Sequence, residues 1–247
     1  MLSKARIKFI KSLQLKKYRK QEQCFVVQGA KSVQELLHSD FETLTVLGTP
    51  EFLDTCPPAG KAEVLEVTPK ALEELGEFQS NDAALAVARL KPNNPLTVGP
   101  AEFALALDDI RDPGNLGTIL RTADWYGIRK IIASSETADF YNAKVISATM
   151  GSFTRVQVYY TDLETYLPTA GCPIFGAFLD GSNVHTTAFG LRGIVLIGNE
   201  SRGISTTLAP LVTHQVTIPR YGQAESLNAA IATAIICDNL ARTIKGV

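Results

Sequence analysis

The chain has 247 residues, of which 45% are hydrophobic and 20% are charged, and its formal net charge is −1. This composition predicts an ordinary globular protein of one or two domains and excludes a disordered or fibrous chain. No apolar run is long enough to cross a membrane, and no apolar segment of the signal-peptide kind follows the basic first residues, so we expect a cytoplasmic protein.

The first part of the chain alternates helices with short strands. The pattern predicts a basic amphipathic helix over residues 3–20, strands at 25–27, 44–47, 64–67 and 84–87, and helices around 33–37 and 69–75. This alternation indicates a small three-layer α/β domain over residues 1–91. Two prolines and two asparagines between positions 91 and 95 break the pattern, and we predict a linker over residues 92–102.

Residues 103–247 are predicted to form a second α/β domain. Strands are expected at 103–107, 131–132, 156–159, 174–178 and 194–197, and helices at 119–125, 143–150, 163–166 and from 227 onward. Continuous β-branched runs are typical of parallel sheets that are covered on both faces. Gly127 is expected to end the first of these helices and Ser226 to cap the last one.

Basic residues are concentrated at the start of the chain. The first twenty residues contain eight Lys or Arg and no acid, which leaves 16 basic against 25 acidic residues, a net charge of −9, in the remainder. A basic end on an acidic body favours a polyanionic partner such as RNA, but a solvated helix face would show the same pattern.

The cysteines and histidines show no metal-binding pattern. The four cysteines lack CxxC spacing, and the three histidines are isolated from one another. We therefore expect no metal and no disulfide framework, with reduced, mostly buried thiols instead.

Three loops at predicted strand ends are candidates for chemistry. The first carries Asn115 and leads to Arg121, whose planar guanidinium suits a phosphate. The second places Asn199 and Glu200 directly after a buried strand, and the third runs from Ile218 to the last helix. Each could be an ordinary turn, but three of them at the strand ends of one parallel sheet indicate a ligand site.

Common ligand motifs are missing from these loops. The chain contains no G-x-G-x-x-G, the segment from Gly198 to Gly203 is not followed by a P-loop lysine, and no G-x-S-x-G surrounds Ser226. The sequence therefore does not support a standard dinucleotide site, a P-loop or a hydrolase elbow.

The three loops together match a known pattern. Residues 115–123 (NLGTILRTA), 197–203 (IGNESRG) and 218–228 (IPRYGQAESLN) resemble, in order and spacing, the three motifs of the SpoU (TrmH-like) RNA 2′-O-ribose methyltransferases. Residues 147–153 (SATMGSF) also look like a helix and turn of that family, and residues 17–19 and 25–29 resemble the start of an L30e-like substrate-binding domain. The resemblance covers the whole second domain, residues 103–247.

The resemblance implies a fold, a cofactor and an assembly. It implies a parallel-sheet domain tied in a trefoil knot, an exception to the usual unknotted topology, behind the small L30e-like domain. It also implies bound S-adenosylmethionine and a homodimer with the site near the subunit interface. The implied cofactor-binding positions are Leu179, Gly181, Ile197, Gly198, Asn199, Gly203, Ile218, Pro219 and Leu227.

The implied catalytic set is Arg121, Asn115, Glu200, Ser226 and Asn228. The family proposal makes the arginine at position 121 the general base, yet a guanidinium normally stays protonated in proteins. Three roles therefore remain open: Arg121 deprotonated in an unusual site, Arg121 as a clamp for phosphate or the developing oxyanion, and Glu200 as the proton acceptor while Arg121 orients it.

The resemblance implies an S-adenosylmethionine-dependent RNA 2′-O-methyltransferase, and the L30e-like domain in front favours ribosomal RNA as its substrate. Lys16, Lys17, Arg19 and Lys20 are the residues expected to hold the RNA backbone. A transfer RNA substrate is the alternative within the class, and a catalytically silent RNA-binding or ribosome-assembly protein on the same scaffold is the alternative outside it.

Overall fold

The computed structural model describes residues 2–77, 81 and 83–245. Contacts between residues divide the chain into two compact units, here called unit 1 (Met1–Pro92 with Asp139–Thr154) and unit 2 (Asn93–Ala138 with Arg155–Val247). Residues 139–154, which we expected in the second domain, thus pack with unit 1. The reason is an aromatic cluster in which Phe25 contacts both Tyr141 and Phe153, with ring centroids 4.8 and 6.2 Å apart.

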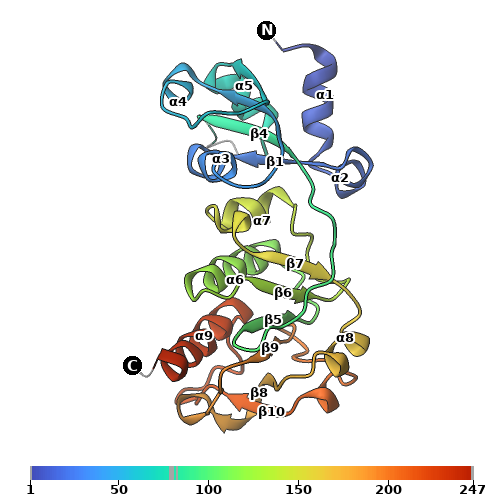
Figure 1. Cartoon of the computed structure of the whole chain (residues 1–247), viewed down its shortest axis with the longest axis vertical. Coiled ribbons are helices and arrows are strands. Elements are labelled where there is room, and N and C mark those ends of the chain that lie inside the picture. The colour runs from blue at the N-terminus through green and yellow to red at the C-terminus, as the bar shows by residue number, and fades with distance from the viewer. Residues whose placement is uncertain (1, 78–80, 82, 246–247) are drawn as a thin grey trace. The chain divides into compact units, whose positions relative to one another are not determined.

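Unit 1 is a four-stranded mixed sheet with helices on both faces (Figure 1). The strand order is β1-β4-β2-β3, and only β2 and β3 run parallel to each other. Its helices are α1 (Lys4–Ser12), α2 (Lys16–Glu22), α3 (Ala30–Leu37), α4 (Pro50–Leu53), α5 (Pro69–Leu75) and α7 (Ala143–Ala148), with the short turn η1 (Ser152–Thr154). Its strands are β1 (Cys24–Gln28), β2 (Thr43–Gly48), β3 (Glu63–Glu66) and β4 (Ala84–Arg89).

Helices cover both faces of the unit 1 sheet. Successive side chains of a strand point to opposite faces, so each face carries apolar side chains that pack against helices. Cys24 and Val26 of β1 join a buried cluster with α1 and α5, while Phe25, between them, points to the aromatic rings on the other face. The helix expected over residues 3–20 is therefore wrong in one respect, since it is two helices, α1 and α2. Arg19 explains the break, because its guanidinium donates to the carbonyl oxygens of Leu13 and Gln14 just after α1 ends.

Arg19 also makes a buried ion pair with Asp139 at 2.6 Å, with the two side chains 3% and 19% exposed. We expect Asp139→Asn to lower the free energy of unfolding by about 3 kcal/mol, because the Arg19 charge would remain buried without its partner. Urea unfolding followed by circular dichroism measures this loss. Glu63→Gln is the matched control, since the Arg6–Glu63 pair is 37% and 48% exposed and is expected to contribute less than about 1 kcal/mol. Equal losses in the two variants would contradict the assignment.

Unit 2 is a six-stranded sheet in which every pairing is parallel, in the order β10-β8-β9-β5-β6-β7. Its strands are β5 (Phe103–Leu107), β6 (Lys130–Ala133), β7 (Gln157–Tyr160), β8 (Ile174–Asn183), β9 (Gly193–Ile197) and β10 (His214–Thr217). Its helices are α6 (Pro113–Trp125), α8 (Leu163–Thr169) and α9 (Ala229–Lys245), with short turns η2 (Val184–Thr186) and η3 (Ala209–Leu211). The expected parallel α/β domain is confirmed.

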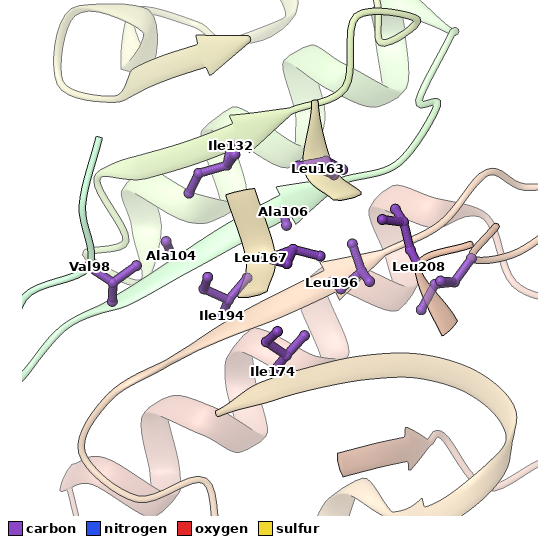
Figure 2. Packing of buried hydrophobic residues seen from close by; sticks show 11 residues of the cluster. Val98, Ala104, Ala106, Ile132, Leu163, Leu167, Ile174, Ile194, Leu196 and Leu208 are labelled. Carbon is purple, nitrogen blue, oxygen red and sulfur yellow. The ribbon is translucent and has the colours of Figure 1, made fainter. Parts of the chain in front are cut away.

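Both faces of the second sheet are covered. Figure 1 shows α6 and α9 on one side and α8 on the other. Ala104 and Ala106 of β5 pack with Ile194 and Leu196 of β9 against Leu167 of α8 (Figure 2). The residues between them in β5 face the opposite side because strand side chains alternate. This double burial explains the continuous apolar runs in the sequence.

The sequence predicts the ends of two helices in unit 2. Gly127 follows the end of α6 with a φ of +76°, as expected for a residue in the left-handed region. Helix α9 begins at Ala229, and its cap is Asn228, whose Oδ1 accepts from the backbone N–H groups of Ala230 and Ile231. The prediction that Ser226 caps this helix is therefore wrong. Asn and Ser are comparable as caps, so the sequence did not distinguish them.

Candidate active site

The three candidate loops lie at one edge of the unit 2 sheet. Asn115 is in the first turn of α6 after β5, Glu200 follows β9, and Asn228 precedes α9 after β10. Strands β5 and β9 are direct neighbours in the sheet. Because parallel strands present their carboxyl ends at the same edge, the loops meet there although they are far apart in the chain.

Glu200, Asn115 and Asn228 form one hydrogen-bonded network. Asn115 Nδ2 donates to Glu200 Oε1 at 2.5 Å, and Asn228 Nδ2 donates to Asn115 Oδ1 at 2.9 Å. Asn228 Oδ1 in turn accepts from the first backbone N–H groups of α9. Each amide in this series donates toward Glu200, so the network fixes the position of the Glu200 side chain relative to α6 and α9.

The loop after β9 is tightly braced by Asn199. Its backbone pairs with Gly203 in both directions, at 3.1 and 2.8 Å, and its side-chain Nδ2 donates to the carbonyl oxygen of Asp109 at 2.8 Å. Its Oδ1 accepts from the backbone N–H groups of Ser201 and Arg202. These bonds fix the backbone on either side of Glu200. A carboxylate on a braced loop is preorganised for its task.

Only glycine fits at position 198, because another segment of the backbone passes very close to it. A Cβ placed on Gly198 would lie 2.2 Å from both the carbonyl carbon of Gly203 and the nitrogen of Ile204. Real Cβ atoms do not approach backbone that closely. The loop therefore turns back across the end of β9 at a distance that only glycine permits.

A cavity of about 860 Å³ opens beside these loops. Its walls come from β8, the loop after β9, and the segment from β10 to α9. All the predicted cofactor positions except Gly181 line it: Leu179, Ile197, Gly198, Asn199, Gly203, Ile218, Pro219 and Leu227. Gly181 is close by in β8, where a Cβ would lie 2.7 Å from the carbonyl oxygen of Gln215, itself a lining residue.

The cavity wall mixes apolar side chains with a few charges. Phe178 and Leu179 from β8 face it together with the apolar residues that follow β9 and β10. Its charged residues are Asp180, Glu200, Arg202, Arg220 and Glu225. A mostly apolar wall with a few polar groups is the usual character of a small-molecule site, and its volume is in the usual range.

Two members of the predicted catalytic set stand apart from the network. Ser226 lines the cavity and is exposed. Arg121 is exposed on α6, does not line the cavity, and makes no hydrogen bond or ion pair with any residue that the structure describes. Asn115, Glu200 and Asn228 are therefore brought together, whereas Arg121 is left available for a ligand.

The predicted RNA contacts in unit 1 divide into two groups. Lys16, Lys17 and Lys20 are exposed on α2. Arg19 on the same helix is buried and bonded to Asp139, Leu13 and Gln14. The expectation that Arg19 contacts RNA is therefore wrong, because its guanidinium already holds unit 1 together.

Several residues of the site were not foreseen from the sequence. Asp108 and Asp109, directly after β5, hold the neighbouring loops: Asp108 Oδ2 accepts from the backbone N–H of Ser205 at 2.7 Å, and Asp109 supplies the carbonyl oxygen that anchors Asn199. The two consecutive acidic residues at the end of a buried strand could have indicated this part of the site from the sequence. Asp180 carried no such signal, because β8 extends five residues beyond the predicted strand 174–178.

The described residues form neither a metal-binding cluster nor a membrane-spanning helix. Residues 2–77, 81 and 83–245 contain no group of three or more His, Cys, Asp or Glu side chains placed to hold a metal ion. Within the same ranges, no helix combines the length and the apolar character needed to cross a membrane.

Comparison with known proteins gives a consistent result over both units. Residues 102–238 match the SpoU rRNA Methylase family, and residues 4–86 match the MRM3-like substrate binding domain. The chain is 29% identical, over 95% of both chains, to the 23S rRNA (guanosine(2553)-2′-O)-methyltransferase RlmP of Bacillus subtilis.

Solved structures agree with the sequence matches. A TrmH-family protein from Porphyromonas gingivalis superposes with a TM-score of 0.87 at 38% identity, covering 97% of this chain and 98% of that one. The AdoMet-bound rRNA methyltransferase from Sinorhizobium meliloti superposes with a TM-score of 0.87 at 30% identity, covering 98% and 96%. Because the SpoU rRNA Methylase match spans more than half of the sequence, this chain belongs to that family.

Proposed function

We propose that this protein transfers a methyl group from S-adenosylmethionine to a ribose 2′-hydroxyl of ribosomal RNA. The observation that carries the proposal is the network of Glu200, Asn115 and Asn228 beside the cavity, since Glu200 belongs to both. The ribosomal substrate is favoured over transfer RNA because RlmP, similar over 95% of its length, is named for a 23S rRNA position. We place the activity in the cytoplasm, where bacterial ribosomal RNA is made.

The cavity suits S-adenosylmethionine in size and chemistry. Its 860 Å³ can enclose a nucleoside with an amino-acid tail. Apolar side chains such as Leu179, Ile218 and Leu227 provide a surface for the adenine, and Asp180, Glu200 and Glu225 provide negative charge for a sulfonium and an ammonium group. Backbone groups at three strand ends supply the remaining polar contacts.

When bound, S-adenosylmethionine supplies an electrophilic methyl group on a sulfonium cation. The protein must then hold the ribose 2′-hydroxyl in line with that methyl group and remove the hydroxyl proton. We propose that Glu200 accepts the proton, because a carboxylate can be tuned toward the working pH whereas a guanidinium stays protonated. Asn115 holds the Glu200 carboxylate in position, and Asn228 holds Asn115.

Arg121 then acts as a cation for the substrate. It is exposed and unpaired among the described residues, so its planar donor fork is available to an RNA phosphate. Ser226 offers a second hydroxyl contact at the cavity wall. In unit 1, Lys16, Lys17 and Lys20 provide exposed positive charge for the RNA backbone.

The family resemblance further suggests a knotted homodimer. Apolar side chains are exposed on α6 and α9, with Trp125 83%, Ile231 51% and Ile244 43% exposed, and a second copy would cover them. Light scattering is expected to give a native mass near twice 26.7 kDa, and a monomer mass would contradict this assembly.

Activity is tested by calorimetry and by mapping. Calorimetry is expected to show binding of S-adenosylmethionine, and ribose-methylation mapping of total RNA is expected to show one ribosomal position that loses its methyl group when the gene is deleted. A chain that binds no cofactor would be a silent scaffold. A lost methyl group in transfer RNA instead would transfer the assignment to that substrate.

A further inference from the structure

One exposed aromatic side chain at the cavity has no role so far. Tyr221 is 95% exposed and lies in the loop between β10 and α9, where it lines the cavity wall. Single exposed apolar residues are common on protein surfaces and need no explanation. Tyr221 differs by its place, since Trp125 and Leu191 are also strongly exposed but do not line the cavity.

The loop that carries Tyr221 projects from the wall and is braced. Residues 220–228 are all exposed. Arg220 Nη1 donates to the carbonyl oxygen of Ala224 at 3.3 Å and so closes the turn around Tyr221. The next residue, Gly222, has open space around its Cα, because a Cβ built there would meet nothing within 4 Å. With 95% of its surface exposed, the Tyr221 ring is presented to solvent beside the cavity.

The charge of the cavity wall limits what electrostatic attraction can contribute there. The lining cations Arg202 and Arg220 are outnumbered by the lining acids Asp180, Glu200 and Glu225. A wall with that balance does not attract RNA phosphates strongly. Recognition at this place therefore needs a contact that does not depend on charge.

We propose that Tyr221 is a substrate-binding residue that stacks on an unpaired base of the RNA, at or next to the nucleotide that is methylated. Single-stranded RNA segments are recognised by splaying their bases onto aromatic side chains. The ribose to be methylated must come to the cavity that Tyr221 lines, so the neighbouring bases pass close to the ring. This inference rests on the proposed function, because it presumes that RNA enters at this cavity.

Stacking and charge contacts respond differently to salt. Loss of a phosphate contact reduces the slope of log affinity against log salt, whereas loss of a stacked base weakens binding without changing the slope. Tyr221→Ala should therefore weaken RNA binding at an unchanged salt slope, whereas the double variant Lys16→Ala with Lys17→Ala should reduce the slope. Tyr221→Phe keeps the ring face and is the matched control.

The probe is protein-free ribosomal RNA from cells that lack the gene. Filter binding at several salt concentrations and initial rates of methylation are measured for the full-length wild type and each variant. For Tyr221→Ala we expect the Kd and KM for RNA to rise roughly 5- to 150-fold, the range that removal of a stacking side chain produces. The salt slope, kcat and the affinity for S-adenosylmethionine should stay close to the wild-type values, and Tyr221→Phe should behave like the wild type.

Four results would overturn the inference: unchanged RNA affinity in Tyr221→Ala, a loss of cofactor affinity in its place, an equal loss in Tyr221→Phe, or a change of native mass that makes Tyr221 a subunit contact. Failure of the proposed function is recognised separately. In that case the wild type itself does not methylate the RNA, while filter binding still reports whether Tyr221 contacts it.

Discussion

Replacing Glu200 with Gln is expected to lower kcat by at least about 100-fold, the smaller end of what a general base contributes. The amide keeps the shape of the side chain and its acceptor for Asn115, so the network should persist. The affinity for S-adenosylmethionine should change little. Single-turnover methylation of ribosomal RNA, together with calorimetry of cofactor binding, measures both quantities.

Arg121→Ala is expected to affect RNA binding, in contrast to the effect of Glu200→Gln on kcat. If Arg121 holds a phosphate, its loss should raise the KM for RNA and reduce the salt dependence of binding, with cofactor affinity retained. Near-normal turnover in Glu200→Gln combined with a collapse of kcat in Arg121→Ala would reverse the roles proposed for these residues. Near-normal activity in Arg121→Ala would remove Arg121 from the site altogether.

Gly198→Ala should disable the cofactor cavity. The added methyl group would lie 2.2 Å from backbone atoms of Gly203 and Ile204, so the loop after β9 has to move. Overpacking costs typically 1–3 kcal/mol and more against rigid backbone, and we expect a loss of about 3 kcal/mol in unfolding free energy. The Kd for S-adenosylmethionine should rise at least about tenfold because this loop forms part of the wall.

Gly222→Ala is the matched control for that variant. Gly222 lines the same cavity, but a Cβ there would meet nothing within 4 Å. Thermal unfolding and calorimetry should therefore give values close to those of the wild type. If both variants bind the cofactor normally, the close approach at Gly198 does not shape the cavity.

The sequence predicted most of what depends on local periodicity and on motifs. Apolar runs such as 194–197 predicted the parallel sheet. A strand that is buried on both faces has apolar residues at every position, and this continuous run is easily recognised in the sequence. The spacing of three polar loops along the chain, read with the family pattern, indicated Asn115, Glu200 and Asn228 before their hydrogen bonds were known.

What the sequence missed depends on contacts between distant residues. The sequence predicts one amphipathic helix at the basic start of the chain. The structure has two, α1 and α2, because Arg19 bonds to the backbone at the end of α1 and to Asp139. The same bonds withdraw Arg19 from RNA binding. The predicted cap, Ser226, lies outside α9, and Asn228 caps the helix instead; its contact with Asn115 joins residues far apart in the sequence and is not visible in local sequence.

The network around Glu200 also has a consequence for the order in which the protein matures. Its hydrogen bonds join residues 85 and 113 positions apart in the sequence, and the last contributor stands at the start of the final helix. Contacts of such long sequence separation form late in folding because the intervening chain must be closed first. A nascent chain in which α9 has not yet folded therefore lacks the complete network of Glu200, Asn115 and Asn228. If this network carries the proposed activity, methylation should begin only after α9 has left the ribosome and packed on unit 2. When the denatured protein is refolded, the return of methylation would then report that unit 2 has folded completely.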